Sequence, residues 1–305
     1  MPKVAIVGAG NVGGFTATRI AQENLAEVVL IDIVKGLAEG KALDIEDARW
    51  LLEYQNGCAG TDDFSQLAGA AIIVVTAGFA RKPGETRQDL LNKNSRLIKD
   101  ISLKVKQYAP DSIVIVVTNP VDTLTYYLYK TTGLDKRRVI GLGLSLDAAR
   151  FANLISRKIN CPVSDIKPMV IASHNEKMLP MARFTMVKGR PLSELLDEAD
   201  IAELVRATRS RGAQIVSALG SGSAYVAPSA AVLRMVKAIL GDAKEDALAS
   251  VVLDGEYGLK DICFGTPVII GKSGIEKVIT LNLSAAESQE YLAAAKEIKQ
   301  CLTLG

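Results

Sequence analysis

The sequence predicts an α/β protein with a doubly wound parallel sheet in its first half and an α+β second half. Apolar runs without in–out alternation recur up to about residue 120, and such runs are typical of parallel strands buried on both faces. Segments with helical periodicity separate these runs, so strands and helices alternate. Alternation of this kind implies right-handed crossovers that place helices on both faces of one sheet.

Each element follows from a local pattern. In the first half, β-branched apolar runs predict strands at Val4–Val7, Val28–Ile33, Ala70–Val75 and Ile113–Thr118. Periodic stretches between them predict helices at Asn11–Asn24, Leu37–Leu52 and Arg87–Tyr108. In the second half the same criterion predicts helices at Leu144–Lys158, Ser193–Ser217, Ala227–Leu240 and Ala285–Leu302.

The strands of the second half are shorter and crowd together. We expect one near Lys167–Ser173, a hairpin around the turn Lys188–Pro191, and others at Val251–Leu253, Asp261–Phe264, Val268–Ile270 and Val278–Leu283. This change of pattern places a domain boundary at Leu144, which separates residues 1–143 from residues 144–305. Because no Pro-, Gly- or Ser-rich linker lies there, we expect the two domains to pack tightly together.

Composition excludes several classes of function. The 305 residues are 49% apolar and 23% charged, which is typical of a globular protein with ample core. The 36 basic and 34 acidic residues nearly cancel and aromatics reach 5%, so we expect no nucleic-acid partner. The longest apolar stretch, around Ala68–Ala80, is too short to span a bilayer, and the first residues do not form a signal-peptide pattern.

The four cysteines, at positions 58, 161, 263 and 301, have neither zinc nor disulfide spacing. We therefore expect no metal site, and we expect the thiols to stay reduced in the cytoplasm.

A glycine-rich turn joins the first predicted strand to the first predicted helix, with the sequence Gly8-Ala9-Gly10-Asn11-Val12-Gly13. In this context the first glycine permits a tight turn, the second lets a pyrophosphate approach the backbone, and the third allows close helix–strand packing. Asp32 ends the next strand, where its carboxylate can accept hydrogen bonds from an adenosine ribose and repel a ribose phosphate. The pattern predicts a Rossmann domain that binds NAD rather than NADP. The alternative is a simple turn and a solvated Asp32.

His174 is the sole histidine and follows a predicted apolar strand. Asp147 and Arg150 lie three residues apart on one predicted helix and so share a face. A carboxylate there can hold an imidazole in one tautomer, and a guanidinium can bind a substrate carboxylate through two hydrogen bonds. From spacing alone, an ordinary helix ion pair fits slightly better, and a lone histidine is more often a satisfied core or surface residue than a catalyst.

Two loops follow predicted strands at their carboxyl ends, where open α/β sheets bind ligands. The first, Thr76–Arg87, contains Arg81 and Arg87 and can close as a lid over an anion. The second contains Asn119, whose amide can donate to a carbonyl or hydroxyl oxygen. Taken alone, the first fits a solvated basic loop better, and the second also fits a turn-forming Asn-Pro.

Taken together and in this order, these segments resemble the lactate/malate dehydrogenase family over essentially the whole chain. The motifs that match are Gly8–Gly13, Arg81–Arg87, Val117–Pro120, Leu146–Arg150, the His174 segment and Gly255–Gly258. Within the family the chain is similar to malate dehydrogenases of the lactate-dehydrogenase-like type. The resemblance implies an NAD-dependent oxidoreductase of the tricarboxylic acid cycle that acts on a small dicarboxylate, malate or oxaloacetate. It also implies a homodimer or homotetramer.

The resemblance implies a role for each matching residue. His174 looks like the proton donor and acceptor, paired with Asp147, and Arg150 looks like the arginine that binds the C1 carboxylate of the substrate. Arg87 resembles the lid arginine that polarises the reacting carbonyl, with Asn119 orienting that oxygen. Positions similar to those near the nicotinamide half of NAD are Asn94, Val117, Thr118 and Asn119. By the same resemblance, the Asn119–Pro120 bond is expected to be cis.

Arg81 sets the expected substrate. The matching residue is typically glutamine in lactate dehydrogenases and arginine in malate dehydrogenases, where it pairs with the second carboxylate of oxaloacetate. Burying Arg81 against a methyl group would strand its charge, whereas a carboxylate neutralises it. The small side chain of Ala224 leaves room for the larger diacid.

One segment departs from the family's pattern. The usual Gly-His-Gly-Asp reads Ser173-His174-Asn175-Glu176 here, although Met178-Leu179-Pro180 continues as expected. Two alternative functions stay open at this point: a lactate or other 2-hydroxyacid dehydrogenase, and a non-catalytic regulator that binds NAD.

Overall fold

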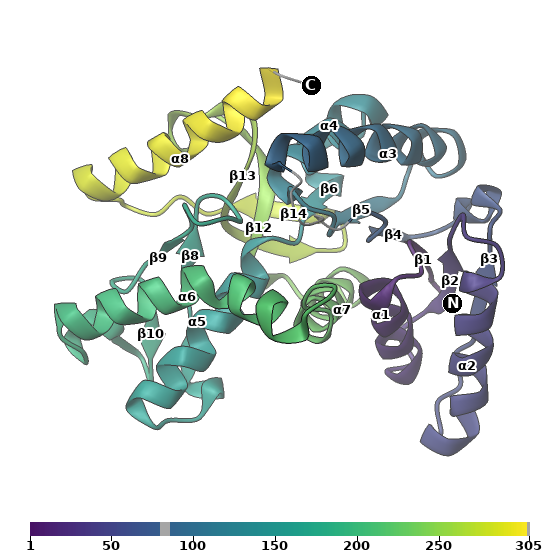
Figure 1. The fold of residues 1–305 in the computed structure, drawn as a ribbon, viewed down its shortest axis with the longest axis horizontal. Helices are drawn as coiled ribbons and strands as arrows, with labels where there is room; N and C mark the ends of the chain where they lie inside the picture. The colour runs from purple at the N-terminus through teal and green to yellow at the C-terminus, as the bar shows by residue number, and fades with distance from the viewer. Residues whose placement is uncertain (80–85, 304–305) are drawn as a thin grey trace.

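The structure is a computed structural model that describes residues 1–79 and 86–303, and a nine-stranded sheet runs through it (Figure 1). The strand order is β14-β13-β12-β6-β5-β4-β1-β2-β3. The strands are β1 (Lys3–Val7), β2 (Glu27–Ile31), β3 (Cys58–Thr61), β4 (Ile72–Val75), β5 (Ile113–Val116), β6 (Val139–Gly141), β12 (Glu245–Asp254), β13 (Lys260–Gly271) and β14 (Gly274–Val278). Strands of the first half pair in parallel, and those of the second half extend the sheet in antiparallel fashion.

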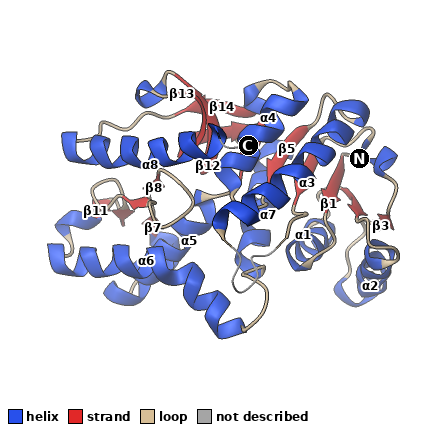
Figure 2. Cartoon of the chain, turned by 45° about the horizontal axis from the view of Figure 1, so that its top comes forward, coloured by secondary structure: helices blue, strands red, loops and turns tan. Residues whose placement is uncertain are grey.

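Helices cover both faces of this sheet, which confirms the predicted fold class (Figures 1 and 2). They are α1 (Asn11–Gln22), α2 (Leu37–Leu52), α3 (Arg87–Tyr108), α4 (Val121–Thr132), α5 (Leu144–Ile159), α6 (Glu198–Leu219), α7 (Val226–Leu240) and α8 (Ala285–Thr303). In β1, Val4 and Ile6 join one core with α1, α2 and α7, whereas Ala5 and Val7 join the other core with α3 and α4. Burial on both faces is the reason the apolar runs lack alternation.

The strand order reverses between β1 and β4, which are neighbours in the sheet. At such a reversal, the loops that leave the two strands turn to opposite faces and open a crevice at the carboxyl ends. Gly8 follows β1, Thr76 follows β4 and Val117 follows β5, so the predicted cofactor residues gather at this edge of the sheet.

The second half both joins the sheet and packs beside it. Its two small sheets contain β7 (Ile166–Lys167), β10 (Met186–Val187) and β11 (Arg190–Pro191), and β8 (Val170–Ile171) with β9 (Leu179–Pro180). The antiparallel pair β10–β11 confirms the predicted hairpin. The two halves meet in the main sheet where Ser250 of β12 pairs with Gly141 of β6, and a Cβ on Gly141 would lie 2.9 Å from Cβ of Ser250.

Three predicted strands of the second half were wrong in extent. The strand expected at 167–173 is divided into β7 and β8 because Pro168 lies between them and has no N–H to donate to a ladder. The strands expected at 261–264 and 268–270 are one strand, β13. Gly265 lies inside it, where a Cβ would come within 2.2 Å of the carbonyl oxygen of Ala172, so this glycine marks a close backbone approach instead of a turn.

Element ends also differ from the prediction. The strand expected at 278–283 was wrong, because the observed strand β14 covers Gly274–Val278 and shares only Val278 with it. The helix expected from Ser193 begins at Glu198, because the Asp197 side chain caps it by accepting from the N–H of Asp200. The first helix ends two residues early, before Asn24 at φ +53°, and β2 ends at Ile31. None of the helices in residues 1–79 and 86–303 is long and apolar enough to cross a membrane.

Candidate active site

The glycine turn after β1 has the geometry that its sequence predicts. Gly8 has φ +107°, and a Cβ there would lie 2.5 Å from the amide nitrogen of Ala77. A Cβ on Gly13 would lie 1.8 Å from the carbonyl oxygen of Gly8, so only glycine lets α1 approach β1 this closely. A Cβ on Gly10, in contrast, would meet nothing within 4 Å. The turn is therefore tight where it packs and open where a pyrophosphate would approach.

The groups around this turn suit a dinucleotide. No side chain caps the start of α1 and its first turn carries no acidic residue, so its N–H groups and positive dipole end are available to phosphates. Asp32 lies just beyond β2, where its Oδ2 accepts the N–H of Ala9 at 2.7 Å and its Oδ1 accepts the N–H of Val34 at 2.9 Å. Nζ of Lys41 donates to the carbonyl oxygen of Gly10 at 3.1 Å, which adds a positive charge beside the turn. These residues fit the NAD that the sequence predicts.

The loops after β1, β4 and β5 are joined by hydrogen bonds. Oγ1 of Thr76 donates to the carbonyl oxygen of Gly8 at 2.9 Å, and Oγ1 of Thr118 donates to that of Ala77 at 2.7 Å. A Cβ on Gly78 would lie 2.4 Å from Cγ2 of Thr118. The N–H of Val117 continues the ladder by donating to the carbonyl oxygen of Val75 at 2.9 Å. The edge of the sheet at the crevice is therefore one hydrogen-bonded unit.

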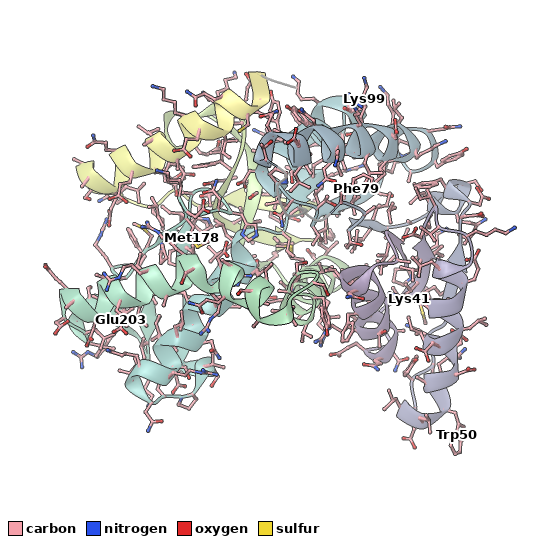
Figure 3. The ribbon with its side chains drawn as sticks, in the orientation of Figure 1. Lys41, Trp50, Phe79, Lys99, Met178 and Glu203 are labelled. Carbon is pink, nitrogen blue, oxygen red and sulfur yellow. The ribbon has the colours of Figure 1, made fainter. Side chains whose placement is uncertain are left out.

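Asn94 on α3 joins two of these loops from the side. Its Oδ1 accepts the N–H of Phe79 at 2.8 Å, and its Nδ2 donates to the carbonyl oxygen of Asn119 at 2.7 Å. Figure 3 labels Phe79, which lies below α3 in that view. The Asn119–Pro120 bond is cis, as the family resemblance implies. The Asn94 side chain thus binds the main chain of the Asn119 turn. This contact leaves the side-chain amide of Asn119 available to other partners.

The structure brings His174, Asp147 and Arg150 together. Asp147 on α5 is fully buried, and its Oδ2 lies 2.5 Å from Nδ1 of His174. Its other oxygen, Oδ1, accepts a hydrogen bond from Nη1 of Arg150 at 3.0 Å. The Asp147 carboxylate therefore contacts both the imidazole and the guanidinium, and the spacing of Asp147 and Arg150 alone could not show the contact with the imidazole.

The surroundings of His174 favour its protonated form. Burial opposes a charge on the ring, but the charge and hydrogen bond of Asp147, together with the charge of Asp122, outweigh it. Arg150 acts in the opposite direction. The net effect raises the pKa of His174 above its ordinary value of 6.5, as suits a group that gives and takes a proton near neutral pH.

Arg150 uses only part of its guanidinium to bind Asp147. The side chain is 13% exposed, and its buried Nε has no hydrogen-bond partner among the residues that the structure describes. A Cβ on Gly212 of α6 would lie 3.4 Å from Nη1, so this glycine leaves room for the guanidinium. A buried donor without a partner is costly, and a ligand carboxylate would satisfy it.

The segment that departs from the family pattern forms a local hydrogen-bonded loop. Oδ1 of Asn175 accepts both the hydroxyl of Ser173 and the N–H of Lys177, each at 2.7 Å. Ala172, at φ +78°, exchanges two backbone hydrogen bonds of 3.0 Å with Gly265. The residues that replace the usual glycines therefore bond to one another and order the loop around His174.

Asp122 and Ser250 contact this site, although neither is among the residues predicted from the sequence. Oδ2 of Asp122 accepts the N–H of His174 at 2.9 Å, and Oδ1 accepts the hydroxyl of Ser250. Burial raises the pKa of Asp122, and the hydrogen bonds from Ser250 and the His174 backbone oppose that rise. The signal that could have found Asp122 is its position, three residues after Asn119.

The lid arginines are only partly placed. Arg81 lies outside the described residues, and Arg87 is the first residue of α3, with a side chain that also lies outside them. The start of that helix is fixed by a capping box, in which Thr86 accepts the N–H of Asp89 and the Asp89 side chain accepts the N–H of Thr86.

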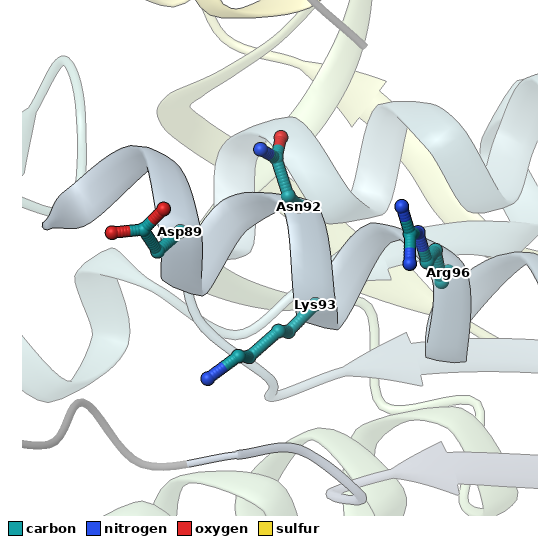
Figure 4. Close-up of a pocket in the computed structure, with 4 residues that line it drawn as sticks. All are labelled: Asp89, Asn92, Lys93 and Arg96. Atoms are coloured by element: carbon teal, nitrogen blue, oxygen red, sulfur yellow. The ribbon is translucent and has the colours of Figure 1, made fainter. Parts of the chain in front are cut away.

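One hollow lies on the surface of α3, lined by Asp89, Asn92, Lys93 and Arg96 (Figure 4). None of these residues is among the predicted site residues. Within residues 1–79 and 86–303, no group of three or more His, Cys, Asp or Glu side chains is placed to hold a metal ion.

Two family models match the sequence. The first describes the NAD-binding domain of lactate/malate dehydrogenases and matches residues 2–141, and the second describes their α/β C-terminal domain and matches residues 145–305. A malate dehydrogenase from Staphylococcus carnosus is 44% identical over 304 residues, which cover 98% of each chain. The solved malate dehydrogenase of Picrophilus torridus is 35% identical, with a TM-score of 0.96 over 99% of this chain and 97% of its own. A lactate dehydrogenase of Cryptosporidium parvum, complexed with lactic acid and NAD, is 33% identical, with a TM-score of 0.96 and the same coverage.

Proposed function

Because the chain belongs to the lactate/malate dehydrogenase family, we propose that its site residues oxidise malate to oxaloacetate with NAD and catalyse the reverse reduction. The activity is that of an NAD-dependent malate dehydrogenase, an oxidoreductase that acts on a CH–OH group. The observation that carries the assignment of residues is the contact of one buried carboxylate, that of Asp147, with both His174 and Arg150. This arrangement places a proton carrier beside a cation that can bind a carboxylate.

NAD, when bound, supplies the hydride acceptor for C2 of malate, and NADH supplies the hydride for oxaloacetate. The residues proposed to hold it are Gly8, Ala9, Gly10, Asn11, Val12, Gly13, Asp32, Asn94, Val117, Thr118 and Asn119. The open space at Gly10 and the uncapped start of α1 support pyrophosphate binding there. The carboxylate of Asp32 supports recognition of an unmodified adenosine ribose.

His174 moves the proton. Its Nδ1 is engaged by Asp147, so Nε2 is the ring atom that can face the substrate. In malate oxidation, neutral His174 takes the hydroxyl proton at Nε2, and Asp147 stabilises the imidazolium that forms. In oxaloacetate reduction, protonated His174 returns a proton from Nε2 to the oxygen on C2. The same atom therefore acts as base in one direction and as acid in the other.

Three arginines are proposed to hold the substrate. Arg150 binds the C1 carboxylate through the part of its guanidinium that Asp147 does not engage. Arg87 polarises the oxygen on C2, with Asn119 orienting it, and Arg81 pairs with the second carboxylate. Two charges on the substrate would then match Arg150 and Arg81, which favours a dicarboxylate over pyruvate.

Consumption of NADH by the purified protein tests this function, with oxaloacetate and pyruvate assayed side by side. We expect rapid consumption with oxaloacetate and little with pyruvate. Arg81→Gln is expected to lower the oxaloacetate-to-pyruvate ratio of kcat/KM by more than about tenfold, or about 1.4 kcal/mol. Arg190→Gln is the matched control, because the Arg190 side chain is 62% exposed and pairs with Glu194 on the surface.

Fast consumption with pyruvate by the unmodified protein would overturn the proposed substrate. Binding of NADH without turnover of either acid would overturn the proposed reaction and favour a regulator.

The same proposal includes the organisation of the protein. We divide the chain into an NAD-binding domain of residues 1–143 and a catalytic domain of residues 144–305, since α5, which carries Asp147 and Arg150, begins at Leu144. Four cysteines with free thiols support a reducing, cytoplasmic location. The interconversion of malate and oxaloacetate there would serve the tricarboxylic acid cycle.

We also propose a homo-oligomer, dimer or tetramer. Large apolar side chains on α2 point away from the core, and among them Trp50 is 86% and Leu43 65% exposed. These two residues are seven apart and so share one face of the helix. Figure 3 shows Trp50 at the outer end of α2. An exposed apolar face of this kind on a surface helix supports contact with a second copy of the chain.

A further inference from the structure

Apart from the contribution of its charge to the pKa of His174, the mechanism above gives the buried carboxyl group of Asp122 no role. Asp122 is the second residue of α4 and follows the turn that carries Asn119. Its side chain is almost fully buried, and so is that of Ser250 on β12. Both carboxylate oxygens accept hydrogen bonds, one from the backbone of His174 and one from the hydroxyl of Ser250. The carboxylate thus joins three segments that are far apart in the sequence.

The packing around this carboxylate leaves little freedom. A Cβ on Gly143 would lie 3.0 Å from Oγ of Ser250, 3.3 Å from Cβ of His174 and 3.3 Å from Cγ1 of Val121. Val121, the residue before Asp122, therefore lies against the same small region as the Asp122 carboxylate. Loss of the hydrogen bond between Asp122 and His174 would therefore shift both the Asn119 turn, which precedes α4, and the loop that carries the imidazole.

The two carboxylates near His174 act on different parts of it. Asp147 contacts the ring at Nδ1, whereas Asp122 contacts the main-chain N–H. Contact with the ring controls protonation and tautomer, while contact with the main chain controls where the ring is placed. Asp122 is also placed to hold His174 in register with Asn119, the residue proposed to orient the reacting oxygen.

We propose that Asp122 is a positioning residue that fixes the main chain of His174 to α4 and β12, so that the imidazole and the Asn119 amide meet the substrate in one geometry. This inference rests on the proposed function of the site. It predicts that the hydrogen bonds of Asp122 matter for the chemical step more than its charge does. An asparagine can keep both contacts, because its oxygen can accept from His174 and its amide can donate to the Ser250 hydroxyl.

Steady-state kinetics of oxaloacetate reduction with the full-length protein test the proposal. Asp122→Ala removes both hydrogen bonds and is expected to lower kcat about a hundredfold with KM for oxaloacetate nearly unchanged, because misplacement of a reacting group affects the chemical step. Asp122→Asn is expected to restore kcat to within about threefold of the unmodified enzyme. Ser112→Ala is the control, since its buried hydroxyl bonds the carbonyl oxygen of Ala70 at the opposite end of β5.

The outcomes separate the possible explanations. Equal losses of kcat in Asp122→Asn and Asp122→Ala would overturn the proposal, because the charge would then be the property that matters. So would a kcat in Asp122→Ala that matches that of the control at equal folded fraction. Should Asp122→Ala not fold, Ser250→Ala removes one of the two bonds. It is expected to lower kcat several-fold without raising KM, and an unchanged kcat would refute the role. Inactivity of the unmodified enzyme would instead refute the proposed function.

Discussion

The backbone N–H of Ala9 donates to Oδ2 of Asp32 at 2.7 Å, which ties the glycine turn to the end of the neighbouring strand. One carboxylate therefore both shapes the turn and presents its remaining lone pairs at the crevice. Asp32→Ala is expected to weaken NADH binding about tenfold, which is typical of the loss of hydrogen bonds to a charged group. It is also expected to bring the affinity for NADPH closer to that for NADH, because a phosphate would no longer meet a like charge.

Fluorescence titration with NADH and NADPH measures both effects. Asp111→Asn is the matched control, because this carboxylate is 97% exposed on the surface. Equal dissociation constants for NADH in the Asp32 variant and the control would contradict the assignment.

The glycines at positions 10 and 13 provide a matched pair of variants. A Cβ on Gly13 would come within 1.8 Å of the carbonyl oxygen of Gly8, so Gly13→Ala is expected to lower the free energy of unfolding by about 1–3 kcal/mol. A Cβ on Gly10 meets nothing within 4 Å of protein, so Gly10→Ala is expected to fold normally and still bind NADH at least about tenfold more weakly. Thermal unfolding and NADH titration of both variants check this. Tight NADH binding by Gly10→Ala would show that the pyrophosphate does not approach there.

Asp147→Asn separates the charge of this carboxylate from its shape. Because the charge and hydrogen bond of Asp147 raise the pKa of His174, the variant is expected to lower that pKa. It is also expected to lower kcat about ten- to a hundredfold, as the loss of a charge-assisted hydrogen bond implies. The chain has one histidine, so NMR titration of the imidazole reports on His174 without assignment. An imidazole pKa that is the same in the variant and the unmodified enzyme would refute the stated cause.

The raised pKa of His174 sets opposite pH dependences for the two directions. Oxaloacetate reduction needs the imidazolium, so its kcat/KM is expected to hold at low pH and to fall about tenfold per pH unit above the folded-state pKa. Malate oxidation needs the neutral ring, so its kcat/KM is expected to fall below the same pKa. Both breaks lie above 6.5, the ordinary value for histidine. Matched profiles in the two directions check this, and coincident optima would count against His174 as the proton carrier.

The exposed face of α2 allows a test of the oligomer. Trp50→Glu places a charge where an apolar side chain would be buried by a second copy, and it is expected to shift the protein towards monomer. Sedimentation velocity at several concentrations measures the shift. Lys99→Glu on α3, labelled in Figure 3, is a control at another surface. A monomeric unmodified protein, or an unchanged oligomer in Trp50→Glu, would exclude this face.

Local patterns predicted the elements that local physics determines. The helix Arg87–Tyr108 was predicted with its observed bounds, since its periodicity is long and Thr86 caps its start. β3, α4 and β6 were not predicted. β3 and β6 are four and three residues long, and β3 contains Gly60, so neither carries a strong pattern of its own. α4 contains several β-branched residues and tyrosines, whose low helix propensity hides the helix from a prediction based on local sequence.

The site shows the same division. The glycine turn and Asp32 could be predicted because their function depends on neighbours within one βαβ unit. The contact of His174 with Asp147 was implied by family resemblance, since spacing on α5 says nothing about a residue 27 positions away. The contact of Asp122 with Ser250 spans 128 positions and depends on the pairing of β12 with β6, which no local pattern specifies.

The pairing of Gly141 with Ser250 has a consequence for how the chain tolerates being cut. Because β12 pairs with β6, a fragment ending before Leu144 would leave β6 as an edge strand with unpaired N–H and C=O groups. Such an edge is a template for other strands, so the isolated first half is expected to self-associate even though it contains a complete nucleotide-binding crevice. Loss of the first half by proteolysis would likewise expose an edge of β12. Each half is therefore expected to aggregate when the other is removed.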